Sequence, residues 1–377
     1  MSVRASIVID NFNYARFLPA AIDSALAQTL PDTEVVLVDD GSTDASLDVI
    51  ARYADRVRPV LKENGGQTSA FNAGLTAARG AVVCFLDSDD LLRPRAMEAA
   101  VAAVDRRSAV KAHWPLRTID AGGTPAHGVI PRGELADGDL RDEVLANGPE
   151  SYPTPPTSGN AWSREFLETV MPLPEIEAGH GVGSASGDAY LSDIAPLFGP
   201  VARIEQELGC YRLHGENDYS SLGFEEKLAR DLWCYDDRCE RLAGWCRRLG
   251  LEADPDRWRS ESWLHRFVEA RQELDAAVPR DAAVLLVDSQ GVGGEVADGR
   301  RTLPFLERDG QYWGAPEDGN LAVRELERMR SEGADFIAFA WPAMWWLDQY
   351  PELERHLAEG FPRILDSERL VAFDLRG

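Results

Sequence analysis

The strongest constraint on the fold is the regular alternation of β-rich runs with helix-like stretches from residue 5 to about residue 110. The β-rich runs are ASIVID, TEVVLVDD, VRPVLKE and GAVVCFLD, and amphipathic stretches such as ARFLPAAIDSALAQT and TSAFNAGLTAAR separate them. Alternating strands and helices are typical of βα units, which build a mostly parallel sheet. We therefore expect an α/β fold in which helices flank such a sheet.

The length of the chain, 377 residues, favours more than one domain. Apolar residues recur every three or four positions from Phe224 to Leu249, which predicts one long amphipathic helix, and a second helix should follow at about 257–275. From Ala283 the strand–helix alternation restarts, and it closes in a hairpin at RILDSERLVAFDL. We expect a first domain at 1–222, a helical linker at 223–278 and a small α/β domain of unknown role at 279–377.

Charge and composition exclude several classes of protein. The net charge of −25 argues against a nucleic acid or an anionic membrane surface as the main partner. No window approaches 18 uninterrupted apolar residues, and the N-terminus lacks the pattern of a signal peptide. The five cysteines are odd in number and lack the paired short spacing of a zinc site. These features predict a cytoplasmic protein without an integral membrane segment.

Two of the β-rich runs end in clusters of acids, Asp39 with Asp40 and Asp87 with Asp89 and Asp90. Ligands of an open parallel sheet bind where the strands end, so we expect both clusters at one crevice. Closely spaced carboxylates repel one another unless a cation or hydrogen-bond donors offset the repulsion, and hard oxygen ligands favour Mg²⁺ or Mn²⁺. Any one of these acids taken alone could equally be a turn or N-cap residue.

The order of the motifs around these acids carries a family resemblance. The chain has no Walker-type phosphate loop and no G-x-G-x-x-G after its first strand. Instead, IVIDNFNYARFLPAAIDSALAQTLPDTEVVLVDDGSTDAS, NGGQTSAFNAGLTAARG and FLDSDDLLRP follow one another, with PTSGNAWSRE, SGDAYLSDIAPLFGP and YRLHGEND further on. As a set, these segments resemble family 2 glycosyltransferases, which are inverting enzymes of the Rossmann-like GT-A fold. The resemblance covers about residues 3–220.

The resemblance implies a nucleotide-sugar site. Asp10, Asn11 and Phe12 lie where the family contacts the nucleotide, and Asp39 lies where it hydrogen-bonds the base or the ribose. The remaining positions that the resemblance assigns to the donor are Gly66, Gln67, Asn72, Asp87 and Ser88.

The resemblance also implies a metal site and a catalytic base. Asp87, Ser88 and Asp89 match the family's Asp-x-Asp (DXD) motif, with Asp89 as the expected metal ligand and Asp90 as a second candidate. His214, in YRLHGEND, matches a histidine that approaches the metal or the diphosphate. Asp188, in GDAYL, falls where the family places its general base. The implied cofactor is Mn²⁺ or Mg²⁺.

Three positions depart from the family pattern. Asp10 and Asn11 replace a Pro-Thr-like pair, Phe71 stands where an Arg is common, and Gly187 stands where a Glu is common. None of these changes removes the implied base or the metal motif, so activity is still expected.

The expected function is transfer of a sugar from a UDP-, GDP- or dTDP-sugar to an acceptor hydroxyl, as in polysaccharide biosynthesis, with a polysaccharide, glycoconjugate or small molecule as acceptor. An alternative is a catalytically inactive nucleotide-sugar-binding scaffold, which Phe71 and Gly187 keep open. A nucleotidyltransferase is disfavoured because the chain lacks its Gly-rich, Arg- and Lys-bearing N-terminal loop.

The C-terminal stretch WPAMWW holds three Trp within six positions. These rings could line a sugar or partner surface, including that of a homo-oligomer formed through the C-terminal region, or they could pack the small domain onto the long helix.

Overall fold

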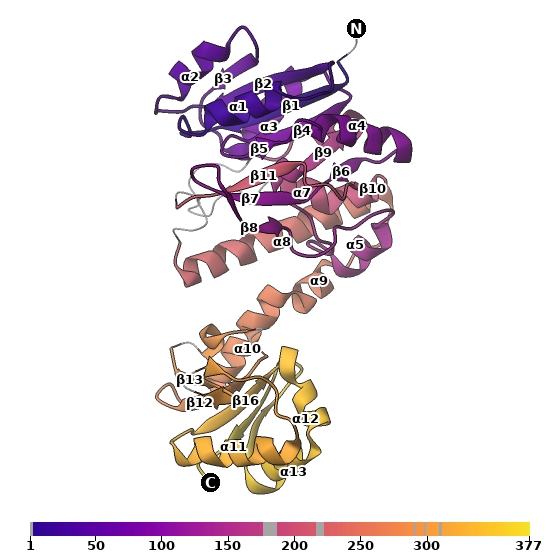
Figure 1. Ribbon diagram of the computed structural model, residues 1–377. Helices are drawn as coiled ribbons and strands as arrows, with labels where there is room; N and C mark the ends of the chain where they lie inside the picture. The colour runs from indigo at the N-terminus through magenta and orange to yellow at the C-terminus, as the bar shows by residue number, and fades with distance from the viewer. Residues whose placement is uncertain (1–2, 176–186, 216–221, 290–291, 298, 309–310) are drawn as a thin grey trace. The chain divides into compact units, whose positions relative to one another are not determined.

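A computed structural model describes residues 3–175, 187–215, 222–289, 292–297, 299–308 and 311–377 of the chain (Figure 1). The chain forms two compact units, Met1–Arg259 and Ser260–Gly377. The α/β architecture expected from the sequence is confirmed in both. Within the described residues, no helix combines the length and the apolar character needed to cross a bilayer.

The first unit is built on a seven-stranded sheet in which every neighbouring pair is parallel except the two pairs made by β9. In spatial order, the strands are β10 (Val201–Arg203), β6 (Lys111–His113), β9 (Asn160–Ser163), β4 (Val82–Asp87), β1 (Ala5–Asn11), β2 (Thr33–Asp40) and β3 (Arg58–Lys62). The core strands β1, β2 and β4 are nearly continuous apolar runs, as expected of parallel strands that are covered on both faces.

Helices cover both faces of this sheet (Figure 1). On one face, α1 (Leu18–Leu26), α2 (Ser46–Tyr53) and α4 (Ala96–Arg107) share one apolar core with alternate residues of β1, β2 and β4. On the other face, α3 (Gln67–Ala77) lies very close to β1. A Cβ at Gly74 would come within 2.2 Å of Val8 Cγ1, so this approach requires glycine.

The strand order reverses at β1. The chain runs outward from β1 to β2 and β3, and then returns to place β4 on the opposite side of β1. In register, Asp10 lies beside Asp87 of β4, and Asn11 lies beside Asp39 of β2. Such a reversal leaves a crevice at the carboxyl ends of the strands, which is where open α/β sheets bind ligands.

A second, four-stranded sheet adds residues from later in the chain to this crevice. Its strands, in order, are β5 (Leu91–Leu92), β11 (Gly209–Leu213), β7 (Leu116–Asp120) and β8 (Pro125–Ile130). The consecutive strands β10 and β11 do not pair with each other, because β10 joins the first sheet while β11 joins this one.

The remaining helical elements of the first unit are α5 (Arg141–Asn147), α6 (Arg164–Val170), α7 (Gly187–Ile194), α8 (Phe224–Leu249), α9 (Pro255–Glu261, which reaches the boundary of the unit) and the short 3₁₀ turns η1 (Thr157–Gly159) and η2 (Ala195–Leu197). The predicted long helix is confirmed as α8. The single helix expected at 257–275 is instead α9 and α10, because the Ser262 hydroxyl accepts a hydrogen bond from the His265 backbone N–H and caps a new helix.

A buried ion pair joins α8 to α7. The Arg238 guanidinium donates two hydrogen bonds to the Asp193 carboxylate, at 2.6 and 2.8 Å, and one to Glu150 at 2.6 Å. Arg238 and Asp193 are 8% and 4% exposed. The bidentate geometry fixes the angle at which α8 approaches the helix that carries Asp188.

The second unit has a five-stranded sheet with the order β13 (Arg301–Pro304), β12 (Ala283–Val287), β16 (Phe336–Ala340), β18 (Leu370–Asp374) and β17 (Arg363–Asp366). The closing hairpin predicted from the sequence is confirmed as β17 and β18. Trp346 is fully buried in the core of this unit, and the Trp341 ring meets the Trp263 ring of α10 at 6.0 Å. The other elements are α10 (Trp263–Ala277), η3 (Gly294–Ala297), β14 (Glu307–Arg308), β15 (Gln311–Tyr312), α11 (Gly319–Ser331), η4 (Trp341–Ala343), α12 (Trp345–Gln349) and α13 (Pro351–Gly360).

We expect Arg238→Ala to lower the free energy of unfolding by about 3–5 kcal/mol, because it leaves the buried Asp193 carboxylate without its cation. Urea-induced unfolding of the full chain measures this change. Arg95→Ala is the matched control, since the Arg95–Glu98 pair is exposed and its loss should change the unfolding free energy far less. Equal losses in the two variants would contradict the structural role of the buried pair.

Candidate functional site

Three carboxylates meet at the end of β4. Asp87, Asp89 and Asp90 each place one oxygen within 4.8 Å of the others. Asp87 is the last residue of β4, and a tight turn in which the Asp90 N–H donates to the Asp87 carbonyl at 3.0 Å folds the other two back toward it. The sequence thus places three acids in four positions, and the turn makes them converge.

Asp10 joins this cluster from β1. The Gln67 side-chain amide donates to Asp87 Oδ1 at 2.9 Å and to Asp10 Oδ2 at 3.5 Å, so it bridges the two strands. Gly66, with φ of 82°, allows the turn that makes Gln67 the first residue of α3. The structure therefore brings together Asp10, Gln67 and Asp87.

The protein environment disfavours the charged forms of these acids. Burial raises the pKa of Asp10 to about 8, although the Gln67 hydrogen bond acts in the opposite direction. Burial also raises the pKa of Asp87 and that of Asp90 well above the usual value, and the negative charges of neighbouring acids raise both further. A bound cation would stabilise the ionised forms.

The second sheet supplies basic groups to the cluster. The His214 Nε2 lies 2.8 Å from Asp89 Oδ2, and the His214 ring lies 4.8 Å from the ring of Phe17. The Arg212 backbone N–H donates to Asp90 Oδ1 at 2.9 Å, and the Arg212 Nε donates to the Asp89 carbonyl at 2.6 Å. These contacts orient the acidic turn from the opposite wall of the crevice.

The donor atoms of the cluster suit a divalent cation. Asp10 Oδ1 and Asp90 Oδ2 are buried and find no hydrogen-bond partner within the described part of the chain. Buried acceptors left without partners are costly. A set of carboxylate oxygens with one imidazole nearby is a donor set that Mg²⁺ and Mn²⁺ accept. The residues present therefore fit the metal implied by the sequence.

Asp188 lies in the first turn of α7. Its Oδ1 is buried and also lacks a hydrogen-bond partner among the described residues. It lies near enough to the cluster for its charge to raise the pKa of both Asp10 and Asp87. Behind α7, the fully buried Lys111 amine donates to Thr154 Oγ1 at 2.6 Å and to Ser192 Oγ at 2.8 Å. Burial lowers the pKa of Lys111 to about 7.

A second polar group lies beside the cluster, at the ends of β1 and β2. The buried Asp39 carboxylate accepts hydrogen bonds from Asn11 Nδ2 at 2.8 Å and from the Ser42 backbone and hydroxyl at 3.0 and 2.7 Å. These bonds hold the loops that follow the two strands together. Phe12, the next residue after Asn11, is 44% exposed at this end of the sheet.

Two neighbouring residues have local structural partners. Asp40 accepts hydrogen bonds from the Gly65 and Gly66 backbone and pairs with Lys62, so it supports the turn before α3. The Asn72 amide donates to the Leu173 carbonyl at 2.9 Å and accepts from the Leu173 N–H at 2.7 Å. The structure does not bring Asn72 to the carboxylate cluster.

Sequence reasoning missed two contributors to the cluster. Arg212 lies two residues before His214, so the period-two alternation of a strand could have placed both side chains on one face. Ser158, whose hydroxyl accepts from the Asp87 N–H at 3.2 Å, lies in the segment PTSGNAWSRE but carried no signal of its own.

Two of the departures from the family pattern, Phe71 and Gly187, touch each other. The Phe71 ring is fully buried and stacks on Phe85 with centroids 4.0 Å apart. A Cβ at Gly187 would come within 2.9 Å of Phe71 Cδ2 and 3.2 Å of Leu173 Cδ1. The aromatic ring therefore occupies the space that any side chain at 187 would need, directly before Asp188.

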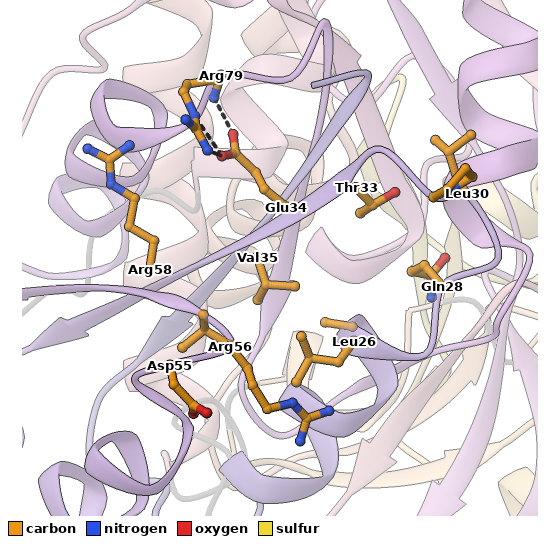
Figure 2. A pocket seen from close by; sticks show the side chains of 13 residues that line it. Leu26, Gln28, Leu30, Thr33, Glu34, Val35, Asp55, Arg56, Arg58 and Arg79 are labelled. Carbon is orange, nitrogen blue, oxygen red and sulfur yellow. Dashed lines mark hydrogen bonds and ion pairs between the residues drawn. The ribbon is translucent and has the colours of Figure 1, made fainter. Parts of the chain in front are cut away.

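A hollow of about 420 Å³ lies at the opposite ends of the strands (Figure 2). Its lining includes Thr33, the first residue of β2, and Arg58, the first residue of β3. Figure 2 shows the Glu34 carboxylate held by Arg79 in this hollow, with two bonds from the guanidinium at 2.7 and 2.9 Å. This hollow lies at the amino ends of the strands and is therefore separate from the carboxylate site. Ligands of such sheets usually bind at the carboxyl ends.

Comparison with known proteins gives a consistent result. Residues 6–144 match the family Glycosyl transferase family 2. The chain is 36% identical over 223 residues to an uncharacterized glycosyltransferase of Nostoc sp., a match that covers 58% of this chain and 67% of the relative. It is also similar to the hyaluronan synthase of Pasteurella multocida, with 47% identity over 237 residues, covering 59% of this chain but only 22% of that relative.

Two solved structures are also similar. TarS 1-349 of S. aureus in complex with UDP-GlcNAc aligns with a TM-score of 0.47 and 14% identity, covering 97% of this chain and 95% of that one. The mannosyltransferase PcManGT of Pyrobaculum calidifontis, in complex with GDP-Man and Mn²⁺, aligns with a TM-score of 0.47 and 18% identity, covering 74% and 77%.

We expect Asp10→Asn to stabilise the metal-free and donor-free chain increasingly as the pH rises from 5 to 8. The unfolded Asp10 carboxyl ionises near pH 4 and the folded one near pH 8, so between these values the folded state binds more protons and wild-type stability falls with pH. The difference in unfolding free energy should grow by up to about 1.4 kcal/mol per pH unit and level off above pH 8.

Urea unfolding at several pH values measures this difference, and Asp55→Asn, at an exposed position, is the control. A difference that does not change with pH would contradict the burial of an ionisable Asp10.

We expect Gly187→Ala to lower the unfolding free energy by about 1–3 kcal/mol, because the new methyl group would overlap the Phe71 ring. Phe71→Leu should relieve part of this loss, so the double variant should be more stable than the sum of the single changes predicts, by about 0.5 kcal/mol or more. Gly244→Ala on α8 is the control, because its Cβ would meet only the Arg247 side chain at 3.8 Å. Strict additivity would refute the contact.

Proposed function

The chain belongs to glycosyltransferase family 2, and on that basis we propose that it is an inverting, metal-assisted enzyme that transfers a sugar from a nucleoside-diphosphate sugar to an acceptor hydroxyl. The observation that carries the proposal is the position of Asp188. Its buried carboxylate oxygen, which has no hydrogen-bond partner among the described residues, lies beside the acidic cluster at the point where the strand order reverses.

We assign the metal to the acidic cluster, with Asp89 as the principal ligand and Asp90 and His214 as further candidates. When bound, the divalent ion neutralises negative charge on the diphosphate. Asp89 and His214 already lie 2.8 Å apart, so they present their polar atoms to one small region. Gln67 and Arg212 hold the surrounding carboxylates in place by hydrogen bonds that do not depend on the ion.

We assign the nucleotide to the adjoining polar group. Asn11 and Asp39 fix the two loops at the ends of β1 and β2, and Phe12 exposes an aromatic ring at the same place, where it can contact a base. We assign the diphosphate and the sugar to Asp10, Gly66, Gln67, Asp87 and Ser88, and the hydrogen bonds from Gln67 to Asp10 and Asp87 support this grouping.

Asp188 is the proposed general base. Its Oδ1, which has no partner within the described ranges, can accept the proton of the acceptor hydroxyl while that hydroxyl attacks the anomeric carbon on the face opposite the leaving diphosphate. This geometry inverts the anomeric configuration. Gly187 leaves room for the Phe71 ring, and this contact sets the start of the helix that carries Asp188.

The matched family region covers residues 6–144, and the chain spans only 22% of the hyaluronan synthase that it resembles. The donor nucleotide, the acceptor and the metal are therefore open to experiment. A thermal-shift screen of UDP-, GDP- and dTDP-sugars, each with and without Mn²⁺, identifies the donor, because a ligand that binds only the folded state raises the melting temperature.

We expect Asp188→Asn to retain the donor-induced thermal shift and to lower turnover by about 10²- to 10⁴-fold, because a positioned base contributes that much to the rate. Asp48→Asn, which changes an exposed Asp in the first turn of α2, should leave turnover unchanged. Wild-type turnover in Asp188→Asn would refute the assignment. Donor binding by the wild-type chain without transfer or donor hydrolysis would favour the scaffold alternative.

A further inference from the structure

A hollow of about 410 Å³ lies between the segment after α6 and the C-terminal half of α8. We call it the α7–α8 hollow. Its lining includes Pro172 and Pro174 on one side, Tyr190 of α7, and Trp245, Arg247 and Arg248 of α8. A smaller neighbouring pocket shares Pro174, Tyr190 and Arg241 with it and reaches Thr68, the residue after Gln67.

The charges in this hollow leave a local excess of positive charge. The carboxylates of Asp237 and Glu240 are engaged by Arg241 and Arg259, each at 2.5 Å. Arg247 and Arg248 are exposed, and neither has an ion-pair partner in the described part of the chain. Two unpaired guanidinium groups at one hollow are notable in a protein with a net charge of −25.

The aromatic residues of the hollow are fixed in place. The Trp245 Nε1 donates to the Tyr190 hydroxyl at 2.7 Å, and the Phe198 ring meets the indole edge-on at 5.3 Å. The Arg248 guanidinium lies 4.7 Å from the centre of the Trp245 ring. A rigid aromatic wall suits the apolar faces of sugar rings, and guanidinium groups bind carboxylates and phosphates through paired hydrogen bonds.

The hollow lies across α7 from the proposed base. Asp188 and Tyr190 are two positions apart on one helix, so with 3.6 residues per turn their side chains point about 200° apart. A molecule that reaches both must extend around the N-terminal turn of α7, a path of roughly one helix diameter, about 10 Å. The occupant is therefore a part of the acceptor remote from the reacting hydroxyl.

We infer that the α7–α8 hollow is an acceptor subsite for an anionic saccharide chain, whose acidic groups bind Arg247 and Arg248 and whose sugar rings lie against Trp245 and Tyr190. This inference rests on the proposed function, because it assigns an acceptor to the same enzyme. The acidic group can be the carboxylate of a uronic acid or the phosphate of a phosphodiester-linked chain.

Binding measurements on the full chain test the inference. The probes are a tetramer of galacturonic acid, a tetramer of glycerol phosphate and neutral maltotetraose, each titrated by calorimetry at low salt. Wild type should bind one or both acidic tetramers and bind maltotetraose at least about tenfold more weakly. The acidic tetramer that binds more tightly identifies the source of the charge.

The double variant Arg247→Gln/Arg248→Gln should bind that acidic tetramer at least about tenfold more weakly than wild type. Arg106→Gln is the matched control, because Arg106 is also an exposed arginine in the last turn of a helix and has no ion-pair partner among the residues that the structure describes, so its change should leave the affinity unaltered. Equal affinity in the double variant and wild type, tight binding of maltotetraose, or no binding of either acidic tetramer would overturn the inference.

The failure of this subsite can be told apart from the failure of the proposed function. The double variant should show the wild-type thermal shift with the donor sugar and a raised KM for the acidic acceptor at unchanged kcat. A wild-type chain that binds no nucleoside-diphosphate sugar but still binds the acidic tetramer through these arginines would refute the proposed function and retain the anion site.

Discussion

The architecture of the first unit depends on holding several carboxylates together where water is largely excluded. Asp10 and Asp87 are neighbours in register on β1 and β4, so the parallel pairing of these strands forces the two acids into contact. The turn after β4 adds Asp89 and Asp90. Neutral and basic partners from elsewhere in the chain, Gln67 from α3 and the Arg212–His214 end of β11 among them, keep this arrangement in place. Binding of a cation would reduce the remaining repulsion between these carboxylates.

The two sheets have different tasks at this site. The large, mostly parallel sheet places acidic and amide groups at its carboxyl edge, while the small sheet places Arg212 and His214 on the other wall of the crevice. Helix α8 is tied to α7 by the buried Arg238–Asp193 pair, and strand β6 is tied to it by the hydrogen bond from Lys111 to Ser192. The helix that carries the proposed base is therefore held by residues far apart in the sequence. A general base must be held at a fixed distance from the reacting hydroxyl, and these contacts limit its movement.

The elements that the sequence predicts well are those with a local signal. The alternation of apolar runs located β1, β2 and β4, and the three-to-four spacing of Phe224–Leu249 located α8, because both periods are properties of adjacent residues. The rule that parallel strands end at one edge predicted one crevice for the acids that follow β2 and β4, whereas Asp10, which lies beside Asp87, was assigned to the site only by the family resemblance. The hydrogen bonds that bring Arg212 and Ser158 to the cluster join residues 122 and 71 positions apart, so local patterns did not reveal these contacts. Strand alternation indicates only that Arg212 shares a face with His214. The sequence predicted one helix over 257–275 because the helical pattern continues through the break between α9 and α10. In the structure, Ser262 caps a new helix at this point.

The contact between Phe71 and Gly187 has a consequence for the history of the family. Each residue taken singly looks like the loss of a charged side chain near a catalytic group. In the structure, the ring of one fills the volume vacated by the other, so neither position can change freely while its partner stays as it is. Descendants of this sequence should therefore inherit the two residues as one unit, and a bulky residue at 187 should be found only where the side chain at 71 no longer occupies this volume.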